Sequence, residues 1–448
     1  MKLIADLHPH SKYARACSGQ LTFENNTKWA NWKGLHLIGT ADFTHPFWFQ
    51  DIKESLTEAG EGIYRYKNEK GKISTWPLFL LTVETSHIFT QNNRGRRIHI
   101  LTFAPSIEIA EKINEEITKH GGNLMSDGRP MLGLSCKELV EIVWGVCEDC
   151  LVIPAHAWTP WFGIFGDKGG FDSLEEAFGE YAKNIYAVET GLSSDPAMNW
   201  RIKELDDRAI VSFSDAHSPW KMGREATIFK LKIKNEKLKI DEIGFSFQDI
   251  IGAIKQEPES RCQIDSTIEF YPEEGRYHYT GHRNCKVRQS PEETKKLGVI
   301  CPVCHRPLTV GVMHRVEELA GRTSEELGIR NEKGLVSSGS PPNHPGYRML
   351  VPLTEILAES FGVGVNTQTV LQPYHRLVQE FGSEFEVLLV TEIEEIKRVA
   401  GERVGEGVGR VRQGKLVIEP GYDGVFGKVK IWGEEEEVES KQESLFDV

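Results

Sequence analysis

The sequence lacks the long hydrophobic runs and the frequent cysteines that mark membrane proteins and disulfide-rich secreted proteins. No segment approaches the roughly 18 consecutive apolar residues of a transmembrane helix. The N-terminal segment becomes polar at Asp6, which is too early for a secretory signal. Eight cysteines in 448 residues are too few for a disulfide framework, so we expect those that cluster to bind metal. These absences predict a cytoplasmic protein.

Two motifs of common hydrolytic enzymes are also missing. The sequence has neither a Gly-x-Ser-x-Gly nucleophile elbow nor a Walker phosphate-binding loop, so no serine nucleophile or P-loop chemistry is expected. Its 39% hydrophobic and 27% charged residues are ordinary for a globular protein, and its length predicts about two to four domains.

Charge is distributed unevenly along the chain. The net charge is −13, of which Gly433–Val448 contributes −6 through seven acids and one base. Between His282 and Arg315 there are instead seven bases and two acids. Because phosphate groups respond to the local field, this basic segment can bind DNA despite the negative total.

Seven apolar segments in the first 220 residues end in, or carry, a residue that can bind metal. They span residues 3–7, 35–40, 78–83, 97–103, 151–154, 185–188 and 209–213. Helix-like segments, such as residues 107–119 and 137–147, lie between most of them. Alternating strands and helices predict parallel β/α units, and the strand ends of a parallel barrel meet on one face. We therefore expect the polar residues to converge in one basin.

This pattern resembles the polymerase and histidinol phosphatase (PHP) phosphoesterase family. The resemblance is carried by His8, His10, Asp42, Glu84, His99, His156, Glu189, Asp215 and His217. It implies a distorted (β/α)7 barrel in which these residues bind two or three metals. Phe43 stands where many members have histidine, so Asp42, His45 or both could be ligands.

The mixture of imidazole and carboxylate ligands suits zinc, manganese or iron, with magnesium favoured by more oxygen-rich sets. Water held between two such ions loses a proton near neutral pH and can attack phosphorus. We expect Asp215, Glu84 and His156 to take part in this chemistry.

Four further ligands form a second pattern. His282-x-x-Cys285 and Cys301-x-x-Cys304 are separated by 15 residues, which is typical of a closed, tetrahedral structural zinc site. His278 and His305 are alternative fourth ligands. We expect a small zinc-binding module over residues 270–315, after a barrel over residues 1–250. The nearby bases Arg283, Lys286 and Arg288 are expected to contact DNA, with a solvated charged loop as the alternative.

The C-terminal sequence is expected to be mostly helical and to bind DNA over residues 316–432. Residues 334–347 are rich in Gly, Ser and Pro and predict a loop or hinge. Gly405-x-Gly407-x-Gly409 could pack closely or contact phosphate. Residues 433–448 predict a disordered acidic tail. Its end, with Gln442, Leu445 and Phe446, resembles the sliding-clamp-binding peptide of archaeal and eukaryotic repair proteins, although a solvated tail is the alternative.

The order of barrel, zinc module and helical region resembles the endonuclease Q family. This resemblance implies a DNA repair endonuclease that cuts 5′ to uracil, hypoxanthine, xanthine or an abasic site in damaged DNA, and a nucleoid-associated location. The alternatives are a PHP exonuclease or phosphatase acting on DNA ends or small phosphate esters, and a DNA-binding clamp adaptor with an inert barrel.

A lesion endonuclease must take the damaged nucleotide out of the base stack. The segment after His156 holds a set of aromatic residues that could form a stacking pocket or wedge, and a packed lid is the alternative. The aromatic candidates are Trp158, Trp161, Phe165 and Phe171.

Overall fold

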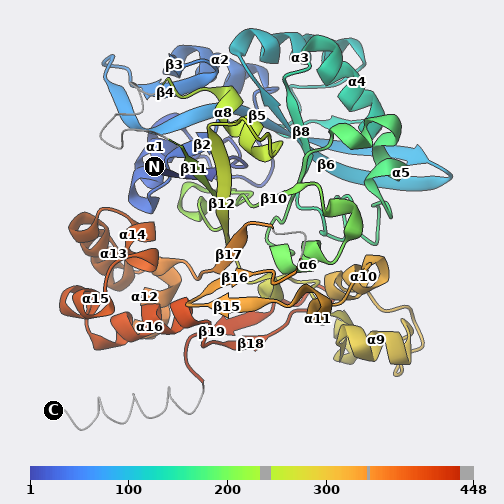
Figure 1. Cartoon of the computed structure of the whole chain (residues 1–448), viewed down its shortest axis with the longest axis vertical. Coiled ribbons are helices and arrows are strands. Elements are labelled where there is room, and N and C mark those ends of the chain that lie inside the picture. Colours follow the sequence, from blue (N-terminus) through green and yellow to red (C-terminus); the bar gives the residue numbers. More distant parts are fainter. Residues whose placement is uncertain (233–243, 341–343, 434–448) are drawn as a thin grey trace.

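The N-terminal half of the protein is an α/β barrel. The computed structural model in Figure 1 describes residues 1–232, 244–340 and 344–433. The barrel strands are β1 (Lys2–Asp6), β2 (Leu37–Gly39), β5 (Ile73–Gln91), β6 (Arg94–Ala104), β8 (Leu151–Pro154), β9 (Ala187–Glu189) and β10 (Ala209–Val211). β1 pairs in parallel with β2, β2 with β5, and β9 with β10, as expected for β/α units.

Helices connect these strands and begin where the local sequence supplies a cap. They are α1 (Phe23–Lys33), α2 (Pro46–Ser55), α3 (Ile107–Lys119), α4 (Cys136–Val146), α5 (Leu174–Phe178) and α6 (Pro196–Trp200), with 3₁₀ turns at Gly179–Asn184, Lys203–Leu205 and Pro219–Lys221. The side chain of Ser106 accepts from a backbone N–H in the first turn of α3. Ser135 and Glu138 form a capping box at α4. The expected helix over residues 107–119 is α3.

One barrel strand runs against the others. β5 and β6 form a long antiparallel hairpin, and β6 also pairs antiparallel with β8. Asn92 and Asn93 at its tip have φ values of 53° and 57°, the left-handed backbone that a tight two-residue hairpin turn needs. The expectation of parallel units is therefore wrong for β6. Glu84, expected at the end of a strand, lies within β5, and His99 lies within β6 as expected.

The sheet extends from the barrel into the C-terminal half. The additional strands are β3 (Leu56–Gly60), β4 (Ile63–Lys67), β7 (Met131–Leu132), β11 (Ala226–Leu231), β12 (Cys262–Glu269), β15 (Arg330–Glu332), β16 (Leu335–Ser337) and β17 (Gly346–Met349). β11 pairs with β1 and β12, and β12 pairs with β17. The sequence 334–347, expected as a loop or hinge, contains β16 and the start of β17, because its backbone completes this sheet edge.

Helices dominate the remainder, as expected. They are α8 (Phe247–Ile254), α9 (Pro291–Leu297), α10 (Val312–Leu319), α11 (Ser324–Leu327), α12 (Leu353–Phe361), α13 (Gln368–Phe381), α14 (Glu384–Leu389), α15 (Ile393–Ala400) and α16 (Glu402–Gln413). The glycine cluster lies inside α16. A Cβ at Gly407 would meet Trp432 at 3.0 Å and Ile356 at 3.1 Å, so this glycine permits close helix packing.

Short strands complete the region that holds the cysteines and the C-terminal hairpin. They are β13 (Thr280–His282), β14 (Val287–Gln289), β18 (Val417–Glu419) and β19 (Lys428–Lys430), with 3₁₀ turns at Pro272–Glu274 and Arg283–Cys285. In Figure 1, β18 and β19 lie between α16 and the α9–α11 region.

A hydrophobic core joins the two halves. Buried side chains of the barrel helices and of the C-terminal helices belong to one cluster, which includes Trp48, Trp158, Tyr374 and Trp432. A second cluster fills the inside of the barrel. Among the described residues, none of the helices has the length and hydropathy needed to cross a membrane.

Candidate active site

Six side chains meet in two overlapping groups at one end of the barrel. Potential ligand atoms of His8, His10, Glu84 and Asp215 all lie within 4.8 Å of one another, and so do those of Glu84, His99 and His156. Glu84 belongs to both groups and can bridge two ions. Five of the six residues are buried, and Asp215 is partly exposed.

The fold brings these residues together from distant parts of the chain. His8 and His10 follow β1, His156 follows β8 and Asp215 follows β10. The φ values of His156 and Asp215 are 28° and 47°, a region that L-residues rarely adopt. Such backbone is common at functional sites, where the surrounding structure holds it in place.

Glu84 and His99 reach the site from the hairpin. In the register of β5 and β6, Ser86 is opposite His99, so Glu84 lies diagonally across on the same face of the hairpin. Glu84 Oε1 lies 2.7 Å from His99 Nδ1 and 3.0 Å from His156 Nε2.

Asp42 and Glu189 hold histidines rather than joining either group. His8 Nδ1 donates to Glu189 Oε1 at 2.9 Å, and His10 Nδ1 donates to Asp42 Oδ1 at 3.1 Å. Each carboxylate also accepts a backbone N–H at 2.7 Å. A carboxylate on the second ring nitrogen typically fixes the orientation and tautomer of a metal-binding histidine. In this geometry, Nε2 of both histidines faces the carboxylates of Glu84 and Asp215.

His217 and His45 also lie outside the two groups. The His217 ring packs edge-on against His10, with centroids 4.8 Å apart, and its Nδ1 donates to the backbone oxygen of Asp215 at 2.8 Å. This bond leaves Nε2 as the acceptor nitrogen of the neutral ring. His45 instead stacks on Tyr13, with ring centroids 4.4 Å apart.

The ionisation states of Glu84 and His99 and an unpaired nitrogen of His8 fit bound metal. Burial raises the pKa of Glu84, but His99 and Arg129 act against it and hold that pKa well below its ordinary value. Burial lowers the pKa of His99 to about 4, which keeps its ring neutral. Metal ligands need these ionisation states. His8 Nε2 is buried and has no hydrogen-bond partner, a deficiency that a bound cation would relieve.

Arg129 is a functional candidate that the sequence patterns did not reveal. Its guanidinium donates to Glu84 Oε2 at 2.9 Å. The loop that carries it is fixed to the barrel, because Gly128 N donates to Tyr13 O at 3.0 Å and Ser86 N donates to Pro130 O at 3.0 Å. Arg129 lies in an irregular segment between α3 and β7, where no periodicity or spacing marks a single arginine.

The aromatic segment after β8 is mostly a packed wall. Trp158, Phe165 and Phe171 are at most 1% exposed and belong to the hydrophobic core, so no face is available for a base. Trp161 packs against Tyr277, with ring centroids 4.9 Å apart. Phe162, which belongs to the same segment but was not among the four aromatic candidates, packs against His99, with ring centroids 4.3 Å apart.

The four expected zinc ligands form a third group. Ligand atoms of His282, Cys285, Cys301 and Cys304 all lie within 4.8 Å of one another, and Cys304 Sγ is 3.3 Å from His282 Nδ1. Burial raises the pKa of Cys301, but hydrogen bonds from the Cys304 backbone and from His282 outweigh it and lower the pKa to about 6. Two residue pairs that supply three sulfurs and one nitrogen fit a tetrahedral zinc ion.

The alternative zinc ligands and the nearby bases lie outside this group. His278 is buried beside Tyr279, and His305 does not contribute to the group. Arg283, Lys286 and Arg288 are exposed, so they are available to a partner.

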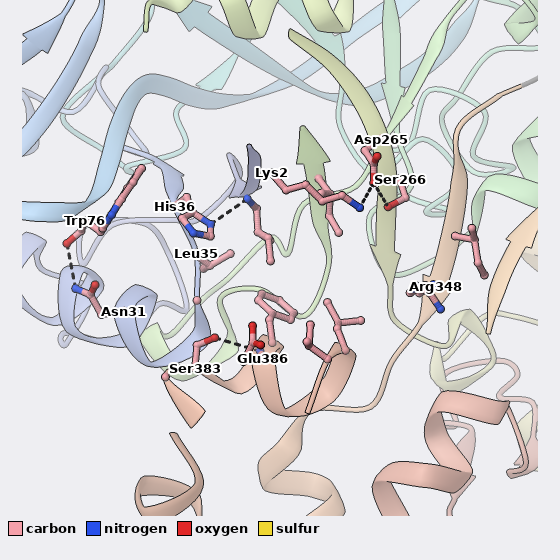
Figure 2. Close-up of a pocket in the computed structure, with 18 residues that line it drawn as sticks. Lys2, Asn31, Leu35, His36, Trp76, Asp265, Ser266, Arg348, Ser383 and Glu386 are labelled. Carbon is pink, nitrogen blue, oxygen red and sulfur yellow. Dashed lines mark hydrogen bonds and ion pairs between the residues drawn. The ribbon is translucent and has the colours of Figure 1, made fainter. Parts of the chain in front are cut away.

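A separate cavity of about 750 Å³ lies between the barrel and the helical region (Figure 2). Its lining includes Lys2, His36, Trp76, Arg348 and Glu386. His36 Nδ1 accepts from the backbone N–H of Ile4 at 3.2 Å, so this histidine fastens β1 to the segment before β2. None of the metal-group residues lines this cavity.

Known sequences match this chain over different lengths, from the C-terminal helices alone to nearly the whole chain. Residues 352–415 match the MJ0043 C-terminal domain family. The chain is 32% identical to protein MJ0043 of Methanocaldococcus jannaschii over 61% of its residues, but it spans only 31% of that longer relative. It is 26% identical to protein YqxK of Bacillus subtilis over 96% of this chain and 99% of that protein.

Comparisons with solved structures extend over the whole chain and confirm the expected fold class. The lesion-specific endonuclease PfuEndoQ from Pyrococcus furiosus superposes with a TM-score of 0.79 at 29% identity, covering 98% of this chain and 99% of that one. Endonuclease Q in complex with a 27-mer duplex carrying an abasic lesion gives a TM-score of 0.79 at 31% identity, covering 97% and 98%. The chain therefore belongs to the endonuclease Q family of metal-dependent DNA endonucleases.

Proposed function

We propose that this protein is a DNA repair endonuclease that cuts the phosphodiester bond 5′ to uracil, hypoxanthine, xanthine or an abasic site. The observation that supports this proposal most directly is the pair of buried ligand groups that share Glu84. It occurs in a chain that superposes over nearly its whole length on an endonuclease Q bound to abasic DNA. Hydrolysis leaves a 3′-hydroxyl and a 5′-phosphate.

The two groups would hold two divalent ions, and His217 is the proposed ligand of any third. Asp42 and Glu189 would orient His10 and His8 toward the ions. Bound divalent ions supply an activated water and neutralise charge on the phosphate during in-line displacement. The ligand set favours zinc or manganese, with magnesium as the more oxygen-loving alternative.

The chain's own residues have distinct roles in this proposal. Asp215 is the most accessible carboxylate of the groups, with a 23% exposed side chain, and is placed to accept a proton from the attacking water. Glu84 and His156 are buried behind it and maintain the geometry of the site. Arg129, with a 21% exposed side chain beside Glu84, is placed to contact the scissile phosphate.

We also propose how the other regions serve the reaction. His282, Cys285, Cys301 and Cys304 would hold a structural zinc ion, which would stabilise the segment that carries Arg283, Lys286 and Arg288 against the phosphate backbone of DNA. Residues 316–432 would complete the DNA-binding surface. In this proposal the chain has three functional parts: a metal-binding barrel over residues 1–250, a zinc module over residues 270–315 and a helical DNA-binding region over residues 316–432.

A sliding clamp is the second proposed partner, and the location is the cytoplasm in association with the nucleoid. The candidate clamp-binding residues Gln442, Leu445 and Phe446 lie outside the described residues, so this proposal rests on their sequence alone.

The test uses duplexes that each contain one uracil, hypoxanthine, xanthine or abasic site, with the product ends mapped. We expect cleavage 5′ to the lesion. A covalently closed plasmid carrying uracil provides the control, since an enzyme that needs DNA ends leaves it intact. Asp215→Ala should abolish cleavage while retaining DNA binding. A protein that cuts none of these substrates, or cuts only from ends, contradicts the proposal.

A further inference from the structure

The turn between β18 and β19 carries an exposed apolar tip. Phe426 is 67% exposed, the highest value among the large hydrophobic residues of the described chain, and its neighbour Val425 is 40% exposed. Exposure of a large ring costs hydrophobic free energy, so an exposed phenylalanine next to a second apolar residue points to a contact with a partner.

The tip is rigidly mounted on the cysteine-containing region. Asp423 accepts from the backbone N–H of Arg283 at 2.7 Å and from the Thr309 hydroxyl at 2.6 Å. Gly427 N donates to Glu274 O at 3.0 Å. A Cβ at Gly427 would lie 2.0 Å from the Glu273 backbone oxygen, so the turn is packed too closely for any side chain there. These contacts therefore hold the turn in place and keep the tip in an exposed position.

Three arginines contact the tip or the turn that carries it. The Arg276 guanidinium lies 4.9 Å from the centre of the Phe426 ring. Arg283 Nη1 is adjacent to Gly424, and Arg288 Nη1 donates to Pro420 O at 3.4 Å. All three arginines are exposed. The turn also holds one acid, Asp423, whose carboxylate accepts from the backbone N–H of Arg283 and from the Thr309 hydroxyl. The turn therefore presents the exposed Phe426 side chain close to three arginines.

The same unit is packed against the metal-binding end of the barrel. Tyr277, next to Arg276, packs on Trp161, and Phe162 after it packs on His99. A chain of contacts thus runs from the tip to a residue of the proposed metal site. The tip is therefore fixed in position relative to the proposed metal site.

We propose that Phe426, assisted by Val425, is a wedge that enters the base stack of duplex DNA beside the damaged nucleotide. Arg276, Arg283 and Arg288 bind the flanking phosphates. Proteins that kink duplexes commonly combine an inserted apolar side chain with basic residues on the backbone. The inserted ring replaces stacking that is lost when the damaged nucleotide leaves the helix. This inference rests on the proposed function for the identity of the DNA.

The test measures base unstacking and affinity, independently of cleavage. Full-length protein in an Asp215→Ala background is titrated into a duplex with one uracil and a neighbouring 2-aminopurine, whose fluorescence rises when it unstacks. We expect Phe426→Ala to abolish most of this rise and to weaken binding of the uracil duplex about tenfold. Phe426→Trp should retain both signals. Ile73→Ala removes another exposed apolar side chain, at the start of β5 and outside the proposed DNA-binding regions, and should change neither.

Two outcomes overturn the wedge. One is a Phe426→Ala protein that keeps the full fluorescence rise and affinity. The other is an equal loss of affinity for damaged and undamaged duplexes with the fluorescence rise unchanged, which indicates an outside contact. Cleavage by the otherwise unaltered protein is measured separately. A wedge signal without cleavage refutes the proposed function alone, and cleavage without a Phe426-dependent signal refutes the wedge alone.

Discussion

Replacement of one buried carboxyl group, Glu269→Gln, should make the protein less sensitive to alkaline pH. Glu269 lies at the end of β12 and is fully buried. Its Oε1 accepts from the hydroxyl groups of Ser212 and Thr267, whereas Oε2 is buried without a partner. Burial is the main cause that raises the pKa of Glu269 from 4.5 to about 8, and the charge of Asp195 adds to it.

The raised pKa determines both the sign and the pH range of the effect. Below about pH 4.5 the carboxyl is protonated in the folded and the unfolded protein, so folding is not penalised. Between about pH 4.5 and 8 only the unfolded protein loses the proton, and the free energy of unfolding falls as pH rises. Where the folded protein keeps this proton and the unfolded protein has lost it, the free energy of unfolding falls by about 1.4 kcal/mol per pH unit. Nearby Glu225, whose pKa burial also raises, acts in the same direction.

Urea denaturation at several pH values between 5 and 8 measures this effect. Glutamine has a similar shape and stays neutral, so Glu269→Gln should match the unaltered protein near pH 5. At pH 8 the free energy of unfolding of Glu269→Gln should exceed that of the unaltered protein by at least about 2 kcal/mol. Glu419→Gln, at an exposed position of β18, is the matched control and should leave the pH dependence unchanged. If Glu269→Gln follows the unaltered protein across this range, the carboxyl is ionised throughout and the reasoning is wrong.

Three further predictions concern the metal site, the cysteine group and the C-terminal residues. Arg129→Ala should reduce cleavage by at least about a hundredfold, as expected when one charge-stabilising donor is lost. Arg129→Lys should recover part of the lost activity. Unchanged single-turnover rates for Arg129→Ala would exclude a phosphate contact. Cys301→Ser should lower zinc content by about one ion per chain and weaken DNA binding while the barrel keeps its metals, because structural zinc supplies folding free energy to a small module; elemental analysis with unchanged zinc would contradict the ligand assignment. Leu445→Ala/Phe446→Ala should abolish stimulation by the sliding clamp, most clearly at higher salt where direct phosphate contacts are weaker; equal stimulation of both proteins in a salt series would reject the peptide.

Local features of this protein could be predicted from the sequence because they depend on residues close together in the chain. Helix α3 has the expected bounds because Ser106 supplies its cap and its apolar residues recur with helical spacing. The two Cys pairs of the third group approach each other because short turns bring x-x-spaced ligands together. Histidines and acids after buried strands were likewise recognisable, since strand ends share one face of a barrel.

The roles of the individual side chains depend on pairings that sequence spacing does not encode. Glu189 contacts His8 across 181 positions of the chain, and only that contact shows it holding the histidine. The antiparallel register of β5 and β6 places Glu84 between the two groups.

The same is true of the basic and aromatic residues around the site. An irregular loop brings Arg129 to Glu84, and core packing covers three of the four aromatic candidates. The sequence by itself determined which chemical groups are available and which local elements form. The tertiary structure decided which atoms meet, because strand register, chain direction and burial arise from contacts between distant segments.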